Sequence, residues 1–178
     1  GKSRREFLKL AAQIPGMYVP ALYDVFYEEE PAEGCLHTPR IQKIVPNQPG
    51  VPEKVSKVMV SDMDSASYPT HPIIPYLQIV HDRAVMEIFR GCIRGCRFCQ
   101  AGMIYRPVRM KSRECILQWV DETLKATGYD EISLTSLSSN DYPGLYDLLR
   151  EIHHTYPHVN VSLPSLRVDA FSLQLMEE

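Results

Sequence analysis

The chain has 178 residues, 44% of them hydrophobic, and its 19 basic and 22 acidic residues give a formal net charge of −3. This length allows one domain, or one domain with an additional arm, and the hydrophobic content is ordinary for a globular protein. The charge excludes a general polycation of the kind that binds nucleic acid. No apolar run is long enough to span a bilayer, so we expect no membrane partner.

Residues 1–83 are predicted to form an irregular N-terminal arm. SRREFLK at residues 3–9 resembles a twin-arginine export signal, but the stretch that follows lacks a clean apolar core and a small-residue cleavage site. We therefore expect a short amphipathic helix that is stopped by Pro15-Gly16. Export is the alternative interpretation of this end of the chain.

The rest of the arm is predicted to be mostly extended. Aromatic and β-branched residues favour a strand at residues 21–27, and residues 57–60 favour another short strand. Residues 31–57 hold five of the fourteen prolines and show little periodicity, which indicates a linker or an extended arm. Cys35 lies alone in this linker and is interpreted as an ordinary thiol.

Strands and helices alternate over residues 84–178, the second predicted domain. The expected strands are residues 84–89, 131–137 and 159–163. The expected helices are one capped by Ser112 that runs to about Ala126 with Gly128 at its end, one capped by Asp141, and one opened by Asp169. This alternation predicts an α/β fold with parallel βαβ units.

Three of the five cysteines, Cys92, Cys96 and Cys99, lie within MEIFRGCIRGCRFCQAGMIYRPVR at residues 86–109. Three residues separate the first pair and two separate the second, a spacing that closes a short loop around one inorganic group. A four-iron cluster on three thiolates keeps one iron without a protein ligand, whereas electron carriers use four cysteines. An open coordination position is typical of a catalytic metal, so the motif predicts a catalytic iron–sulfur cluster.

The neighbours of the cysteines fit this interpretation. Glycines let the backbone approach a cluster, and the loop has Gly91, Gly95 and Gly102. Arginines place positive charge beside a cluster, and the loop has Arg90, Arg94 and Arg97. A zinc knuckle would need a fourth ligand, and the nearest histidine, His81, lies outside the loop. A disulfide scaffold would need an even set of cysteines in a small secreted chain. Free cysteines beside a cluster indicate a reducing compartment, and we expect the cytoplasm.

Three loops are expected to converge. The cysteine loop follows the first strand of the alternating region, residues 136–141 follow the second, and residues 164–169 follow the third. Parallel barrels carry their chemistry at the carboxyl ends of their strands, so all three loops are expected on one face.

The cysteine pattern, with the aromatic Phe98 before its last cysteine, resembles the signature of the radical S-adenosylmethionine (radical SAM) superfamily. HDR at residues 81–83, RGCIRGCRFCQAGMIYRPVR, LTSLSSNDY and SLPSLRVD resemble one subgroup, uncharacterised radical SAM proteins that usually carry a preceding cobalamin-binding domain. The resemblance covers most of the chain. It implies a fragment of a larger protein that holds the first half of a partial (β/α)6 TIM-like barrel, preceded by the irregular arm.

The resemblance also implies an enzyme with a [4Fe-4S] cluster on Cys92, Cys96 and Cys99 and S-adenosylmethionine (SAM) at the open iron. A reductant such as flavodoxin or ferredoxin supplies the electron that cleaves SAM to methionine and a 5′-deoxyadenosyl radical, which abstracts hydrogen from a substrate. The substrate and the residues that act on it stay unassigned, with RNA modification as one candidate. Cobalamin is expected only in the full-length protein, and the fragment alone is expected to be inactive.

Five residues are candidates for contact with SAM beyond the cluster. Phe98 can shield the cluster or stack on adenine. Many members bind the methionine amino group with a Gly-Gly-Glu-like stretch after the second strand, where this chain has Ser138, Ser139 and Asp141. Arg167 is a candidate bidentate partner for the SAM carboxylate. The structural alternatives are that Asp141 caps a helix, the serines form a turn, and Arg167 pairs with Asp169.

Two other classes of function stay open. The first is an iron–sulfur electron carrier or cluster-holding protein without radical chemistry. A fourth cysteine near the other three would favour it, and none is near. A nucleic-acid binder is favoured by a basic stripe with interleaved aromatic residues. Residues 90–111 are basic, but the predicted cluster accounts for much of that charge.

Overall fold

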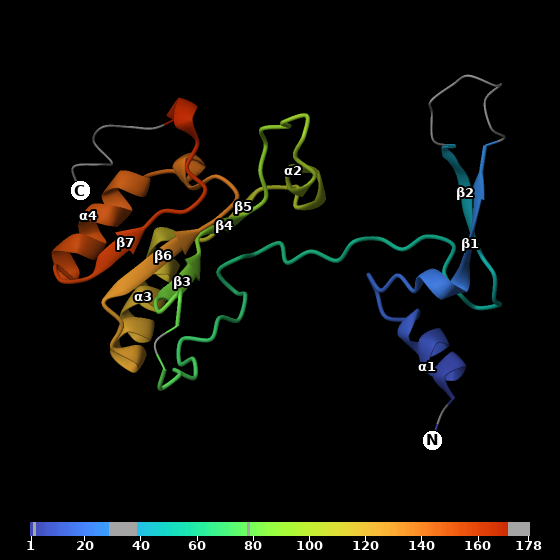
Figure 1. Ribbon diagram of the computed structural model, residues 1–178, viewed down its shortest axis with the longest axis horizontal. Helices are drawn as coiled ribbons and strands as arrows, with labels where there is room; N and C mark the ends of the chain where they lie inside the picture. Colours follow the sequence, from blue (N-terminus) through green and yellow to red (C-terminus); the bar gives the residue numbers. More distant parts are fainter. Residues whose placement is uncertain (2, 29–38, 78, 171–178) are drawn as a thin grey trace. The chain divides into compact units, whose positions relative to one another are not determined.

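The computed structural model describes residue 1 and residues 3–28, 39–77 and 79–170 (Figure 1). The chain divides into two compact units, Gly1–Met59 and Val60–Glu178, and each is taken by itself below. None of the helices in the described ranges is long and apolar enough to cross a membrane.

The first unit combines a short helix with two antiparallel strands. Helix α1 (Arg4–Ala11) begins with a capping box, in which Ser3 Oγ accepts from the Glu6 N–H and the Glu6 carboxylate accepts from the Ser3 N–H. A 3-10 turn, η1 (Pro20–Leu22), leads into strand β1 (Tyr23–Tyr27), which pairs with β2 (Ile41–Pro46). The buried core of this unit consists of Ala12, Val19, Leu22, Tyr23 and Val51.

Strand β2 lies within residues 31–57, where a linker or an extended arm was predicted, and its pairing with β1 agrees with an extended arm rather than with an unpaired linker. Val25 pairs with Ile44, and Pro46 pairs with Tyr23 at the end of the ladder, where a missing N–H costs little. Prolines at the edge of a strand therefore do not mark a linker. Residues 57–60 form no regular strand, contrary to expectation. The predicted helix and first strand of the arm are confirmed, and Cys35 lies outside the described residues.

The second unit is built on a parallel sheet. Strands β3 (Ala84–Glu87), β6 (Glu131–Thr135) and β7 (Asn160–Ser162) lie in the order β3-β6-β7. The register pairs Met86 with Leu134 and Ile132 with Val161. Helix α3 (Arg113–Thr127) connects β3 to β6, and α4 (Leu145–Thr155) connects β6 to β7. The predicted α/β class with parallel βαβ units is confirmed, and closure into a barrel of six units stays a prediction.

One face of this sheet packs against both helices. The buried cluster on that face includes Ala84, Met86, Ile132 and Leu134 from the strands and Ile116, Val120, Leu124, Leu148, Leu149 and Ile152 from the helices. Because side chains alternate along a strand, the polar residues Glu87 and Thr135 turn to the opposite face. These two residues are register partners at the carboxyl ends of β3 and β6.

The two crossover helices start differently. Ser112 caps α3 by accepting from the Cys115 N–H at 3.1 Å, and Gly128 ends it in the left-handed region at φ +71°, as predicted. Helix α4 instead follows Gly144 and has no side-chain cap. The prediction that Asp141 caps it was wrong, because Asp141 lies earlier, in a 3-10 turn η2 (Ser139–Asp141), and its carboxylate is bound elsewhere.

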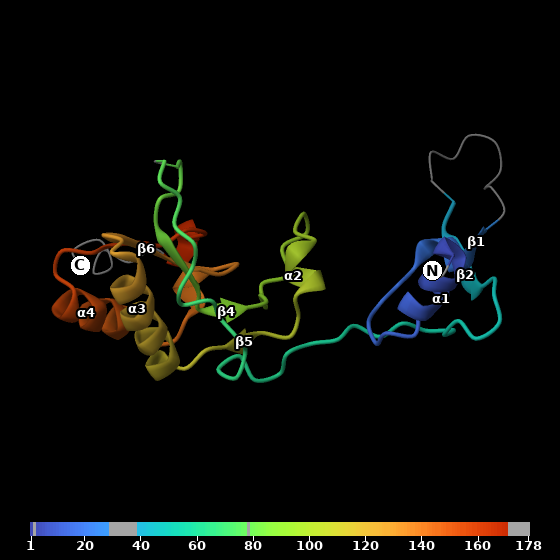
Figure 2. The same cartoon turned by 90° about the horizontal axis from the view of Figure 1, so that it is seen from below.

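A two-residue antiparallel pairing forms the neck of the cysteine loop. The single strand expected at residues 84–89 is interrupted at Ile88, after which β4 (Phe89–Arg90) pairs with β5 (Arg109–Met110). Figure 2 shows β4 and β5 between the parallel sheet and the loop that carries the short helix α2 (Ala101–Ile104). Gly91 has φ +98°, and a Cβ there would lie 2.6 Å from the carbonyl oxygens of Tyr105 and Pro107. Only glycine therefore fits at this neck.

The third predicted strand is shorter in the structure than expected. The strand expected at residues 159–163 is β7, and Asp169 lies in a 3-10 turn, η3 (Val168–Ala170). The remainder of the expected helix falls outside the described residues.

Candidate metal and cofactor site

The cysteine loop lies between β4 and α2, next to the carboxyl end of the parallel strand β3. Cys92 and Cys99 are half-buried, and Cys96 is exposed. The Cys99 N–H donates to the Cys96 carbonyl at 3.0 Å, so a tight turn joins the last two cysteines. The Gly102 N–H donates to Cys99 Sγ at 3.4 Å.

The donor chemistry of this loop suits an iron–sulfur cluster. Thiolates are soft ligands, and cysteines that hold such clusters accept hydrogen bonds from backbone N–H groups, as Cys99 does here. A Cβ at position 102 would lie only 3.8 Å from Cys99 Sγ, so glycine brings the backbone close to the sulfur. Within the described residues, no three His, Cys, Asp or Glu side chains are gathered closely enough to hold a metal ion. The three metal ligands stay a prediction from donor type and spacing.

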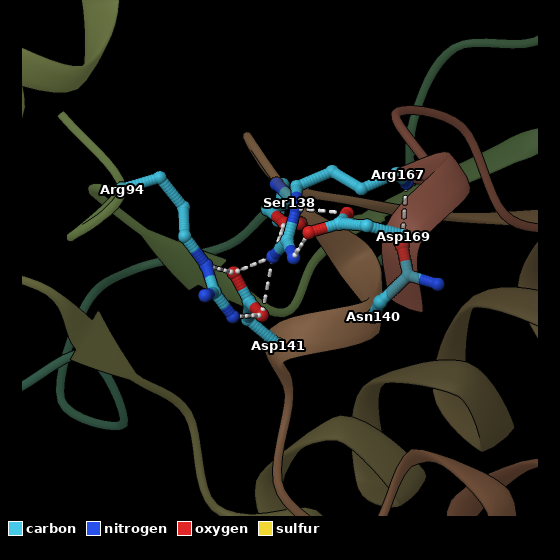
Figure 3. Close-up of polar contacts among 7 residues, drawn as sticks. Arg94, Ser138, Asn140, Asp141, Arg167 and Asp169 are labelled. Atoms are coloured by element: carbon cyan, nitrogen blue, oxygen red, sulfur yellow. Dashed lines mark hydrogen bonds and ion pairs between the residues drawn. The ribbon is translucent and has the colours of Figure 1, made fainter. Parts of the chain in front are cut away.

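A polar cluster around Asp141 joins the cysteine loop to the loops that follow β6 and β7 (Figure 3). Arg94 lies between Cys92 and Cys96, and its Nε and Nη2 donate to the two carboxylate oxygens of Asp141 at 3.2 and 2.6 Å. Arg167, in the loop after β7, donates from Nη1 to the same two oxygens at 2.8 and 2.9 Å. The expected convergence of the three loops is confirmed by these direct contacts.

Arg167 is the most connected member of this cluster. Its Nε and Nη2 donate to the carboxylate of Asp169 at 3.0 and 2.7 Å, which is the pairing foreseen as the structural alternative. Its backbone N–H donates to Asn140 Oδ1 at 2.7 Å, and Nη1 donates to Ser138 Oγ at 3.4 Å. The Asp169 side chain is 71% exposed, against 21% for Arg167 and 18% for Asp141. Asp169 is therefore the exposed, outer partner of Arg167, and Asp141 is the more buried, inner partner.

The charges of this cluster balance within it. Hydrogen bonds from Arg94, together with those from Ser138 and Arg167, hold the pKa of Asp141 well below its usual range, against the opposing effect of burial. Its two aspartate partners raise the pKa of Arg167 further above its already high range. All four groups are therefore charged at neutral pH, and two guanidinium groups neutralise two carboxylates.

The remaining predicted SAM contacts differ in accessibility. Ser138 and Ser139 are 1% and 0% exposed, and the Ser139 hydroxyl donates to the Pro164 carbonyl at 2.8 Å. The Asp141 N–H donates to the Ser138 carbonyl, so the serines do form the turn of the structural alternative. Phe98, by contrast, is 93% exposed beside Cys99. The polar cluster thus contains Asp141, Arg167 and Ser138, while Ser139 ties two loops together and Phe98 stands apart.

A hollow of about 540 Å³ lies at the foot of the cysteine loop, on the sheet face opposite the helices. It is lined by Glu87, Phe89, Arg90, Gly91, Tyr105, Thr135, Ser136 and Leu137. Arg90 donates from Nε and Nη2 to the two carboxylate oxygens of Glu87 at 2.8 and 2.5 Å. Sequence reasoning missed Glu87, although a charged residue near the end of an otherwise apolar strand was a usable signal.

Comparison with models of protein families identifies the superfamily of this chain. The model that describes the radical SAM superfamily matches residues 86–178, just over half of the chain. The chain therefore belongs to the radical SAM superfamily, which confirms the resemblance inferred from the cysteine motif. The expected subgroup with a cobalamin-binding domain stays a prediction.

Two curated relatives are similar to this chain. One is an uncharacterised protein of Methanocaldococcus jannaschii, 27% identical over 124 residues that cover 70% of this chain and 28% of that protein. The other is the threonylcarbamoyladenosine tRNA methylthiotransferase MtaB of Treponema pallidum, 27% identical over 126 residues that cover 66% of this chain and 26% of that protein. The chain thus spans about a quarter of the length of these relatives.

Proposed function

We propose that this chain carries the cluster-binding portion of a radical SAM enzyme that cleaves SAM reductively to a 5′-deoxyadenosyl radical. One observation carries the proposal. In a chain of this superfamily, the loop with three cysteines at CxxxCxxC spacing lies at the carboxyl end of a parallel strand, where parallel barrels hold their ligands. Three thiolates keep one iron of a four-iron cluster available to SAM.

The roles of the loop residues follow from their chemistry. Cys92, Cys96 and Cys99 would hold the cluster, which supplies an electron to SAM bound at its open iron. The Gly102 N–H stabilises negative charge on Cys99 Sγ, since it already donates to that sulfur. Phe98 is exposed beside Cys99 and offers an aromatic surface that can cover a bound nucleoside and exclude water.

Arg167 is the residue that we propose for the SAM carboxylate. Its Nε and Nη2 edge is paired with Asp169, whose side chain is 71% exposed. A ligand carboxylate can take the place of this outer partner and form the same two hydrogen bonds, while Nη1 keeps its contacts with Asp141. Ser138 and Asp141 then accept hydrogen bonds from Nη1 on the more buried side of the guanidinium, and Ser139 maintains the turn.

The substrate, the reductant and any second cofactor belong to the whole protein. One relative is named a tRNA methylthiotransferase, so RNA is the first substrate class to test. The reductant that we propose is a flavodoxin or ferredoxin. Cobalamin is part of the same proposal only for the full-length protein, in which corrinoid absorbance would report it.

Anaerobic reconstitution of the full-length protein tests this function. Iron and sulfide are counted, and electron paramagnetic resonance spectra of the dithionite-reduced protein are recorded with and without SAM. We expect four irons per chain, a spectrum that changes when SAM is added, and release of 5′-deoxyadenosine and methionine. Cys96→Ala should abolish all three results.

Cys115→Ala is the matched control, because Cys115 lies in α3 outside the motif. It should behave as wild type. Stoichiometric zinc in place of iron would refute the cluster. The protein could instead hold a complete cluster whose spectrum does not change when SAM is added, and release no 5′-deoxyadenosine. That result would support the electron-carrier alternative.

A further inference from the structure

We infer that Arg94 is a positioning residue, which fixes the segment between Cys92 and Cys96 against the loop after β6. The inference rests on the proposed function and deepens it. Arg94 lies midway between these two cysteines, and it reaches 47 positions along the chain to Asp141. A contact at this point controls the part of the loop that has to fold around the cluster.

The contact has the geometry of a specific clamp. Nε and Nη2 of Arg94 meet the two oxygens of one carboxylate, an arrangement that only a planar guanidinium can make. The Arg94 side chain is 43% exposed while that of Asp141 is 18% exposed, so the exposed cysteine loop is attached to a more buried carboxylate. A lysine would retain the charge but would lose the two-point contact.

Other groups hold this carboxylate in place. Asp141 closes the turn η2, in which its N–H donates to the Ser138 carbonyl at 2.9 Å. Arg167 binds both Asp141 oxygens and is itself held by Asn140 and Asp169. With both oxygens taken by guanidinium groups, Asp141 acts on the cysteine loop through Arg94 and not as an open acceptor for a ligand.

Gly95 shows how the loop accommodates this clamp. It follows Arg94 directly and has φ +64°, a conformation that residues with a side chain rarely adopt. The backbone therefore turns sharply between Arg94 and Cys96. The Arg94 side chain can point to Asp141 (Figure 3) while the chain proceeds to the next cysteine.

The test compares Arg94→Gln, Arg94→Lys and Arg113→Gln in the full-length protein. Arg113 is the matched control, since its side chain is 42% exposed in an ion pair with Glu151 outside the cysteine loop, close to the 43% exposure of Arg94. In metal-free protein, hydrogen exchange of residues 91–99 should quicken about five-fold in both Arg94 variants, which corresponds to about 1 kcal/mol at 25 °C. After reconstitution, the reduced cluster should show altered g-values and should lose iron to a chelator several-fold faster. Arg113→Gln should match wild type in all three measurements.

A double-mutant cycle with Asp141→Asn assigns the effect to the pair. If Arg94 acts through Asp141, the double variant should lose iron no faster than Asp141→Asn alone. Additive effects, or Arg94 variants that exchange like Arg113→Gln, would overturn the inference. If wild type binds no cluster, the proposed function fails, and hydrogen exchange in metal-free protein still decides whether Arg94 clamps the loop.

Discussion

Removal of the buried ammonium group of Lys111 should destabilise the second unit. Lys111 follows β5 and is 4% exposed, which is unusual for a lysine. Its Nζ donates to the Met63 carbonyl at 2.6 Å and lies 3.7 Å from the centre of the Trp119 ring. Trp119 stacks in turn on Tyr68, with ring centres 4.6 Å apart. One side chain thus ties the segment around Met63 to α3.

The expected cost follows from these contacts. A hydrogen bond from a charged donor contributes about 1.5–3 kcal/mol, and a partly desolvated cation–π contact contributes about 1–2 kcal/mol. The substitution also removes the desolvation cost of burying the ammonium group, and this offsets part of the lost stabilisation. We therefore expect Lys111→Met to cost about 2 kcal/mol. Lys111→Ala also removes the buried stem, at about 0.8 kcal/mol per methylene, and should cost about 4 kcal/mol.

Urea unfolding followed by fluorescence checks these values, because Trp119 is the single tryptophan of the chain and lies at the site. Lys125→Ala is the control. Lys125 is 71% exposed in an ion pair with Asp121, so its loss should cost less than about 0.5 kcal/mol. If both Lys111 variants unfold within about 0.5 kcal/mol of wild type, the ammonium contacts contribute nothing and the reasoning fails.

Two further predictions concern the neck and the polar cluster. Gly91→Ala should distort the neck and lower the iron content of the reconstituted full-length protein several-fold, because the new Cβ would meet two carbonyl oxygens at 2.6 Å. Gly128→Ala also has a positive φ but meets no atom within 4 Å, so it should retain full iron content; equal loss in both variants would implicate backbone strain alone. Hydrogen bonds from Arg94 and Arg167 lower the pKa of Asp141 in the folded state, so the unfolded chain binds more protons below about pH 4 and stability is lost as pH falls through that range. Urea midpoints of metal-free wild type should therefore approach those of Asp141→Asn between about pH 5 and pH 2, and parallel curves would contradict the assignment.

Features encoded by neighbouring residues could be read from the sequence. Ser112 and Gly128 mark both ends of α3, and the spacing of the three cysteines identifies the superfamily. The strand–helix alternation gives the parallel sheet. In each case the decisive residues lie within a few positions of one another, so no knowledge of the tertiary structure is needed.

Features that depend on distant partners could not be read in this way. Strand β2 exists because it pairs with β1 across residues 28–40, and local periodicity carries no sign of that pairing. Asp141 is a good helix cap by residue type, yet two arginines remote in sequence take its carboxylate. The burial of Lys111 depends on a carbonyl group 48 positions away. Tertiary contacts override local preference at all three places.

The neck formed by β4 and β5 closes the cysteine loop at its base. The pairs Phe89 with Met110 and Arg90 with Arg109 bring the two ends of the loop together before it begins. The pairing of β3 with β6 runs from Ala84 with Ile132 to Glu87 with Thr135 and includes no residue of the loop. Evolution can therefore lengthen, shorten or exchange the residues between the cysteines and β5 without shifting the sheet, and an engineered loop can be grafted at the same base.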